Sequence, residues 1–208
     1  MKWFFVILLS VSLFHTTAVA AENPVAPSVE VDHQRIRNAV EKSLLLLERG
    51  SAGSAEKRPC FTCHSQALPV LAITSARDHG FKIDKANLRR QLDHTAAFLS
   101  RGKENYVAGK GQGGRIDTAG YALWTLQAGK YKPDDVTVAV VDYMLKTNAD
   151  SAHWTHSSNR PPTEASDFTT TYVALRGLLA FGTADQRTRI TQRQNTVVQW
   201  LLNTSTSD

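Results

Sequence analysis

The sequence predicts an all-α protein built from repeated pairs of helices. Three observations lead to this prediction: apolar residues recur at helical spacing along most of the chain, no segment has a convincing strand pattern, and glycine and aspartate recur with a period of about 50 residues. The segment 136–141 is rich in β-branched residues, but Asp134-Asp135 before it and Tyr143-Met144-Leu145 after it favour a helix there as well.

Seven helices are expected, and short signals in the chain mark where several of them begin and end. They span residues 36–50, 67–80, 84–102, 118–129, 133–148, 167–182 and 184–203. Gly50, Gly80 and Gly102 are expected stops, because glycine is favoured just beyond the last turn of a helix. Pro69 falls in the first turn of the second helix, where proline is tolerated, and Asp84 is placed to cap the third.

The even-numbered helices share a pattern that indicates an internal repeat. Each closes at a glycine, and an aspartate suited to cap the next helix follows within five residues: Gly80 and Asp84, Gly129 and Asp134, Gly182 and Asp185. The odd-numbered helices carry aromatic–aliphatic pairs near their ends, at Phe98-Leu99, Tyr143-Met144 and Trp200-Leu201. A period of about 50 residues made of two helices is typical of a stacked array of helix pairs, and a plain bundle with similar apolar stripes is the alternative.

Three long connections lead into the even-numbered helices and hold most of the reactive side chains. They span residues 51–66, 103–117 and 149–166 and are expected to lack helices. Long connections without secondary structure are uncommon in compact domains and are often functional. If the helix pairs stack side by side, all three connections meet at one end of the array.

The first 20 residues have the pattern of a secretory signal peptide. Lys2 supplies the positive start, an apolar run follows from Trp3 to Phe14, and Ala18-Val19-Ala20 offers a small-residue cleavage site. That run is shorter than the roughly 20 residues that a membrane-spanning helix needs, so we expect no transmembrane segment after the signal is removed. The mature chain is expected to be periplasmic or extracellular.

Removal of the signal defines the expected organisation and charge of the mature chain. It leaves 188 of the 208 residues: a flexible lead at 21–35, a repeat domain at 36–203 and a polar tail at 204–208. The signal contains one lysine and no acidic residue, so the net charge falls only from +5 to +4. The size fits one domain, and the small charge argues against nucleic acid as a partner.

The two cysteines lie in Cys60-Phe61-Thr62-Cys63-His64, which has the C-x-x-C-H spacing of haem c attachment. Such a site uses the two thiols to bind the haem vinyl groups and the adjacent histidine to bind the iron, so Cys60, Cys63 and His64 are the predicted cofactor-binding residues. His64 is the expected proximal ligand, and the sixth ligand is left open among Met144, His79, His94, His153 and His156. A disulfide or a redox-active dithiol is the first alternative, and a metal site is the second.

Three stretches in the second half of the chain point to a family. They are Tyr143-Met144-Leu145, Asn148-Ala149-Asp150-Ser151-Ala152-His153-Trp154, and Pro162-Thr163-Glu164-Ala165-Ser166-Asp167-Phe168-Thr169-Thr170-Thr171-Tyr172-Val173-Ala174-Leu175. They resemble the repeats of squalene cyclases and protein prenyltransferase β-subunits. More closely, the chain from about Ile36 to Leu202 resembles exported bacterial proteins of that superfamily that carry a C-x-x-C-H near the start. The resemblance implies an α/α toroid with the even-numbered helices in an inner ring and the odd-numbered helices in an outer ring.

The resemblance also implies sites at the loop end of the inner ring. Prenyltransferases hold zinc there through Asp, Cys and His, for which this chain offers Asp117, Cys60 or Cys63, and His64 or His153. Squalene cyclases protonate their substrate with a D-x-D-D motif, and the nearest segment, Lys132-Pro133-Asp134-Asp135, lacks the first aspartate. The side chains that would line or brace a central cavity are Asp117, Tyr121, Trp124, Trp154, Asp167, Phe168 and Tyr172.

Each of these sites has a structural alternative. Asp117 and Asp167 precede equivalent helices and are placed to act as N-caps, and the aromatic residues are equally suited to core packing. Arg115, Arg160 and Arg176 lie near the same end and would suit an anion such as diphosphate, although isolated arginines are usually surface residues.

Three functions follow from these patterns. The first is a haem-bearing α/α toroid in electron transfer or redox sensing, with a redox protein as partner. The second is an isoprenoid-processing enzyme or isoprenoid-binding module, and the third is a protein-binding scaffold. Three helix pairs and one further helix make roughly half of the ring that the superfamily usually forms, so we expect either an open arc that buries its edge against a partner or a second copy, or a truncated form of a longer protein.

Overall fold

Amphipathic helices make up most of the described chain. The computed structural model describes residues 32–161 and 163–204, and its contacts divide the chain into Met1–Asp32 and His33–Asp208. The described helices all belong to the second of these units. The predicted signal peptide, residues 21–31 of the predicted lead and residues 205–208 of the predicted tail lie outside the described residues.

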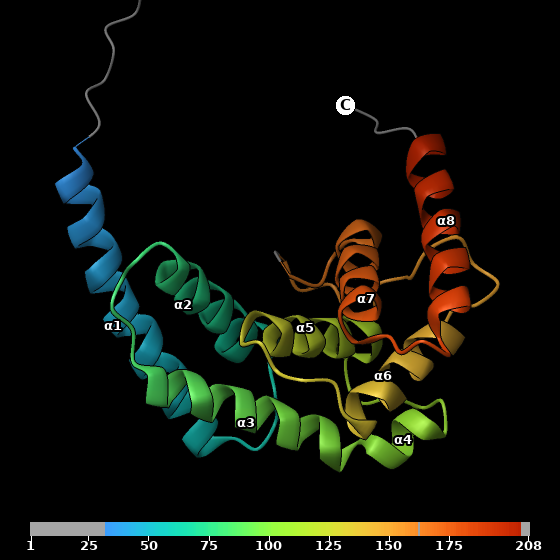
Figure 1. Cartoon of the computed structure of the whole chain (residues 1–208), viewed down its shortest axis with the longest axis horizontal. Coiled ribbons are helices and arrows are strands. Elements are labelled where there is room, and N and C mark those ends of the chain that lie inside the picture. The colour runs from blue at the N-terminus through green and yellow to red at the C-terminus, as the bar shows by residue number, and fades with distance from the viewer. Residues whose placement is uncertain (1–31, 162, 205–208) are drawn as a thin grey trace, which may run out of the picture. The chain divides into compact units, whose positions relative to one another are not determined.

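The second unit consists of helices joined by turns and loops (Figure 1). In chain order they are α1 (His33–Lys57), the π-helical turn η1 (Cys63–Ala67), α2 (Leu68–Asp78), α3 (Lys85–Arg101), α4 (Lys103–Val107), α5 (Arg115–Ala128), α6 (Asp135–Lys146), α7 (Asp167–Phe181) and α8 (Arg187–Asn203). Within the described ranges no strand forms, and the β-type pairing there is a single bridge between Arg160 and Glu164. The all-α prediction is confirmed. None of these helices is apolar over a length that would cross a membrane.

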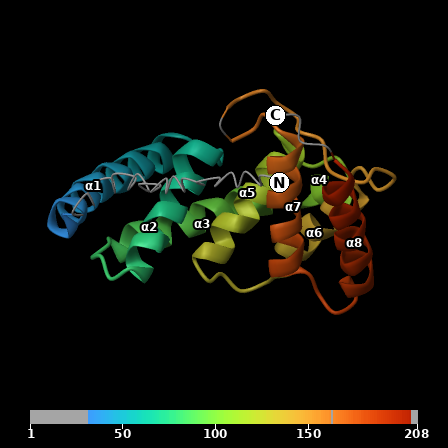
Figure 2. The ribbon, with the colours of Figure 1, turned by 90° about the horizontal axis from the view of Figure 1, so that it is seen from above.

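The helices of this unit lie in two rows. α2, α5 and α7 follow one another in one row, and α1, α3, α6 and α8 follow one another in the second (Figures 1 and 2). Across the rows, α1 packs on α2, α3 on α5, and α6 on α7. The chain therefore alternates between the rows, which is the packing that an array of helix pairs requires.

Two of the predicted aspartate caps are confirmed. A carboxylate oxygen of Asp84 accepts a hydrogen bond from the Asn87 amide at 2.9 Å and so caps the first turn of α3. Asp134 accepts from the backbone of Val136 and Thr137 and starts α6 with a complete capping box. The predicted cap at Asp185 is wrong, because α8 begins at Arg187 after an uncapped turn.

α1 is longer than predicted. It begins three residues before the predicted start and continues through Gly50 to its end at Lys57. The glycine does not stop the helix, because the Asn87 side chain of α3 donates to the Glu48 carbonyl at 3.1 Å and to the Ser51 hydroxyl at 3.2 Å. The prediction of an unstructured connection at 51–66 is therefore wrong at both of its ends, where α1 and η1 lie.

The connection at 103–117 also contains more helix than predicted. α4 forms there because Tyr106 is buried against Tyr143, with ring centroids 5.3 Å apart, and donates its hydroxyl to Gln112 at 2.8 Å. α5 then begins earlier than predicted, at Arg115, directly after Gly114. Gly114 has a φ of +79°, a left-handed conformation that glycine adopts at little cost.

α5 and α7 pack together more extensively than any other pair of described helices. A Cβ atom placed on Gly120 of α5 would lie 2.7 Å from Cγ2 of Val173 and 2.9 Å from its carbonyl carbon. Gly177 of α7 faces Leu123 of α5 in the same way, at 2.9 Å. The contacts advance in the same direction along both helices, so α5 and α7 run parallel and their first turns lie at the same end.

Replacing Gly120 tests this close contact. Gly120→Ala should lower the free energy of unfolding by about 1–3 kcal/mol, because the added methyl group overlaps the α7 backbone. Gly50→Ala is the control, since nothing lies within 4 Å of its Cβ position in α1, and it should stabilise the protein by about 0.8–1 kcal/mol. Chemical denaturation followed by circular dichroism measures both, and a stabilising Gly120→Ala would contradict the packing.

Candidate functional site

The three long connections meet at one end of the helix rows, as the sequence predicted. The Cys63 thiol contacts Glu164, which joins the first connection to the third. Ser157 donates its hydroxyl to the Gly114 carbonyl at 2.9 Å, which joins the third connection to the second. This loop cluster holds the buried polar groups discussed below.

The segment that carries the cysteines is fixed by α3 and by its own turn. A ring nitrogen of His94 lies 3.3 Å from the Cys60 carbonyl, and Arg101 donates to the carbonyl of Pro59. Thr62 caps η1, and the buried Gln66 side chain accepts from the Thr62 amide at 2.8 Å. As a result the first residue of η1, Cys63, is turned into the protein while Cys60 stays exposed.

Cys63 and Glu164 form the centre of the candidate site. The Cys63 Sγ donates to Oε1 of Glu164 at 3.1 Å, and the two residues are 3% and 4% exposed. The other oxygen, Oε2, accepts from the Ser158 hydroxyl and from the Arg160 guanidinium, each at 2.5 Å. The bridge between the backbones of Arg160 and Glu164 holds this carboxylate in place.

Burial and hydrogen bonding act on these two groups in opposite directions. Burial, and then the hydrogen bond to Glu164, raise the pKa of the Cys63 thiol well above its usual range. Burial also opposes ionisation of Glu164, but the hydrogen bonds from Ser158 and Cys63 and the charge of Arg160 outweigh it and lower the pKa of that carboxyl. At neutral pH the site therefore holds a protonated thiol against an ionised carboxylate.

Asp117 is a second buried carboxylate in the loop cluster. It lies in the first turn of α5 and is fully buried. It accepts from the Thr170 hydroxyl of α7 and from both the amide and the hydroxyl of Ser157, the latter two at 3.1 Å. The N-cap prediction for Asp117 is wrong, because Gly114 occupies that position. Its carboxylate instead joins α5, α7 and the third connection.

Asp167 also lies inside its helix, and the predicted cap is wrong there too, because Ser166 caps α7. One Asp167 oxygen lies 2.6 Å from Nδ1 of His156, and the other lies 3.3 Å from Nε2 of His153. Burial opposes ionisation of Asp167, but its contacts with His156 and His153 lower its pKa. Both imidazoles are therefore engaged at Asp167.

The predicted haem-attachment residues do not face a common space. Cys60 and His64 are exposed, whereas the Cys63 thiol is turned toward Glu164. The pocket beside Cys60, of about 480 Å³, is lined by neither Cys63 nor His64. The residues as folded here do not fit a haem held by both thiols and His64, so attachment would require the Cys60–His64 segment to open.

The predicted sixth ligands and zinc ligands are dispersed. Met144 is fully buried in the core. His79 Nδ1 donates to the Ser75 carbonyl at 2.8 Å at the end of α2, and His94 lies beside the motif. Among residues 32–161 and 163–204, no group of three or more His, Cys, Asp and Glu side chains is arranged to hold a metal ion. The predicted zinc set of Asp117, cysteine and histidine is not assembled here.

Two of the predicted cavity residues belong to the core. Tyr121 donates its hydroxyl to the Thr163 carbonyl at 3.1 Å, and the Trp154 indole donates to the Met144 carbonyl at 3.0 Å. Both side chains are buried, and the guanidinium of Arg193 lies 4.1 Å from the centroid of the Trp154 ring. These two aromatic residues brace the core rather than line a cavity.

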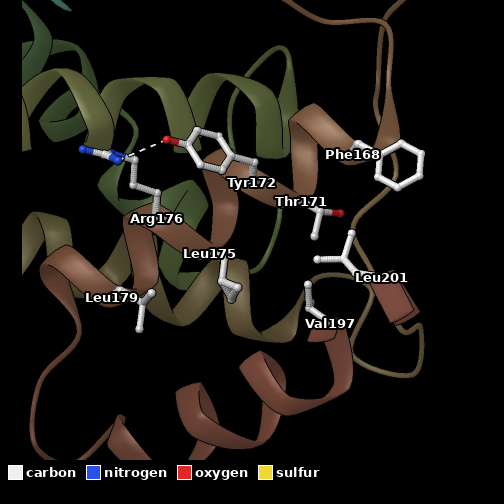
Figure 3. Close-up of a pocket in the computed structure, with 8 residues that line it drawn as sticks. All are labelled: Phe168, Thr171, Tyr172, Leu175, Arg176, Leu179, Val197 and Leu201. Atoms are coloured by element: carbon white, nitrogen blue, oxygen red, sulfur yellow. Dashed lines mark hydrogen bonds between the residues drawn. The ribbon is translucent and has the colours of Figure 1, made fainter. Parts of the chain in front are cut away.

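Phe168 and Tyr172 instead line an apolar groove between α7 and α8 (Figure 3). Its volume is about 420 Å³. Trp124 lies beside it, with its ring 5.5 Å from that of Tyr172 and nearly perpendicular to it. The groove is lined by Phe168, Thr171, Tyr172, Leu175, Arg176, Leu179, Val197 and Leu201. No carboxylate is among them, so the lining of this groove does not include an acid of the kind with which squalene cyclases protonate their substrate.

Sequence reasoning did not single out Glu164, Ser157 or Ser158. Glu164 is 101 residues from Cys63, so no local spacing could reveal the contact. The available signal was the Arg160–Glu164 spacing of four residues in a connection rich in polar groups. That spacing is common on any chain and becomes informative only with the cysteine opposite it.

The buried Glu164 predicts a specific acid sensitivity. Its lowered pKa contributes stability that is present above the usual carboxyl value of 4.5 and is lost as the pH falls through the lower folded value. Glu164→Gln should lower the free energy of unfolding at pH 7 by about 1–3 kcal/mol and flatten its decline below pH 4.5. Melting curves from pH 7 to pH 3 measure this, with the exposed Glu41→Gln as control. Identical acid profiles for the two variants would contradict the assignment.

Comparison of the chain with protein-family models, with curated proteins and with solved structures finds no match.

Proposed function

We propose that the chain is an exported redox protein that works by dithiol–disulfide exchange at Cys60 and Cys63. The hydrogen bond from the buried Cys63 thiol to the Glu164 carboxylate carries this proposal. Exchange in a C-x-x-C pair needs one accessible sulfur to meet the substrate and a second sulfur that resolves the mixed disulfide. The exposed Cys60 and the buried Cys63 supply these two positions.

The first step occurs at Cys60. Its thiolate attacks a disulfide of a substrate, one S–S bond forms between Cys60 and the substrate, and the substrate S–S bond breaks. The released substrate sulfur leaves as a thiolate and takes a proton from water. Cys63 is shielded from the substrate during this step because it is 3% exposed.

The second step uses Glu164. Because Cys60 is exposed while the Cys63 thiol is turned toward Glu164, the turn between them must first bring the two sulfurs together. Cys63 Sγ then attacks Cys60 Sγ while its proton passes to the Glu164 carboxylate, which is its hydrogen-bond acceptor. A Cys60–Cys63 disulfide forms, and the second substrate sulfur leaves and is protonated. Two electrons have then moved from the protein dithiol to the substrate disulfide, and the reverse direction obeys the same balance.

Reaction with the disulfide dithiobis(nitrobenzoate) tests both steps. The wild-type chain should release one thionitrobenzoate from Cys60 and then a second when Cys63 resolves the mixed disulfide. Cys63→Ser should stop after the first release, with the mixed disulfide retained at Cys60. Glu164→Gln should leave the first phase unchanged and slow the second by about tenfold or more, because the proton acceptor is lost.

The controls separate the proposal from nonspecific thiol reactivity. Glu41→Gln should match the wild-type protein in both phases, and Cys60→Ser should react slowly because only the shielded thiol remains. A Cys63→Ser variant that still releases a second equivalent would overturn the mechanism, as would equal second-phase rates in Glu164→Gln and wild type.

A c-type cytochrome is the second candidate, favoured by the C-x-x-C-H motif itself; the Cys60–His64 segment would have to open to turn the Cys63 thiol away from Glu164. A bound haem would supply one-electron chemistry at its iron. Because both thiols would then be consumed in thioether bonds, the two candidates exclude each other. A pyridine haemochrome spectrum, recorded after expression with a haem-attachment system, decides between them. Covalent haem in the wild-type chain that is altered in Cys60→Ala would replace the dithiol proposal.

A further inference from the structure

The groove between α7 and α8 leaves large apolar side chains in contact with water. Phe168, Tyr172 and Leu179 of α7 are 45%, 50% and 58% exposed, and Leu201 of α8 is 49% exposed. The buried side chains of Thr171 and Val197 lie between them. An apolar concavity of about 420 Å³ is within the size range of small-molecule sites, and its lining favours an apolar ligand chain.

Arg176 supplies the one charged group in this lining. Its guanidinium lies 4.9 Å from the centroid of the Trp124 ring, and Nη1 donates to the Tyr172 hydroxyl at 3.1 Å (Figure 3). No carboxylate of the described chain pairs with it, and its buried Nε has no hydrogen-bond partner there. An aromatic face and a hydroxyl therefore hold the cation in place, and its Nε–H group is left without a hydrogen-bond acceptor among the described residues.

The position of Arg176 defines the ligand further. Arg176 and Phe168 are eight residues apart on α7, which corresponds to about 12 Å along the helix axis. A ligand with its head at Arg176 would therefore have room for an extended apolar tail toward Phe168 and Leu201. A single guanidinium matches a monoanionic carboxylate in charge and in planar geometry, whereas a phosphate monoester carries a charge of about −1.5 to −2.

We propose that this groove binds a long-chain carboxylate, with the carboxylate at Arg176 and the alkyl chain along α7 toward Phe168 and Leu201. The site is separate from the cysteines, and it does not depend on the redox chemistry proposed above. The alternative occupant of the groove is an apolar helix of a second copy of this chain. The cation in this open groove, which no carboxylate of the described residues pairs with, favours the small amphiphile.

Titration of the full chain with hexadecanoate, below the concentration at which it forms micelles, tests the proposal. Trp124 lies beside Tyr172, and Trp200 stacks on Phe168 at 4.9 Å, so tryptophan fluorescence should report saturable binding. Hexadecanol has the same tail without the charge and should bind about tenfold more weakly. Arg176→Gln should remove this preference, whereas Arg187→Gln, an exposed change on α8 outside the groove, should retain it.

The comparison of the acid with the alcohol uses the unaltered chain, so it holds even if Arg176→Gln does not fold. Equal affinity for the two ligands, or absence of saturable binding, would overturn the proposal. Sedimentation velocity tests whether the chain instead self-associates through this groove. Self-association that is abolished by Leu179→Glu would assign the groove to a second copy and would also overturn it.

Discussion

The parallel contact between α5 and α7 determines where the reactive side chains of this protein lie. Because Gly120 allows the α7 backbone to approach, the first turns of the two helices are adjacent. The Asp117 carboxylate can then accept from Thr170 across the interface, and Tyr121 can donate to the Thr163 carbonyl. The third connection is thereby held over the helix ends, which places Glu164 opposite the Cys63 thiol.

The loop cluster contains two buried carboxylates, and they are satisfied in different ways. Asp117 accepts from hydroxyl and amide donors, without an ion pair among the described residues. Glu164 has a guanidinium, a hydroxyl and a thiol as donors. A buried carboxylate is costly unless its oxygens are hydrogen-bonded, so loss of any one partner affects the whole cluster. The arrangement thus combines rigidity at Asp117 with a reactive group at Glu164.

Local signals predicted the helices well and the contacts between them poorly. The caps at Asp84 and Asp134 could be identified because a cap acts within three residues of itself. The stop at Gly50 was wrong because α3 stabilises the following turns of α1, and the propensity of one residue is a weak effect beside such packing. α4 was missed for the same reason, since burial of Tyr106 against Tyr143 creates it.

The candidate site was predicted in part. The cysteine motif was found from its spacing, but its partner Glu164 was not, because a contact across 101 residues leaves no periodic pattern. Asp117 and Asp167 were identified as residues of interest, although both lie inside their helices rather than at the caps. Phe168 and Tyr172 were expected to face inward, and the structure places them on an exposed face of α7.

The hydrogen bond from Cys63 to Glu164 links the chemistry of the sulfur to the stability of a loop. Any reaction that consumes this thiol, whether it forms a disulfide or a thioether, removes a donor from the carboxylate that anchors the third connection. By thermodynamic reciprocity, a partner that binds this connection and holds Glu164 in place must make the thiol harder to modify to the same extent. The covalent state of one sulfur and the local unfolding free energy of a distant segment are therefore coupled quantities.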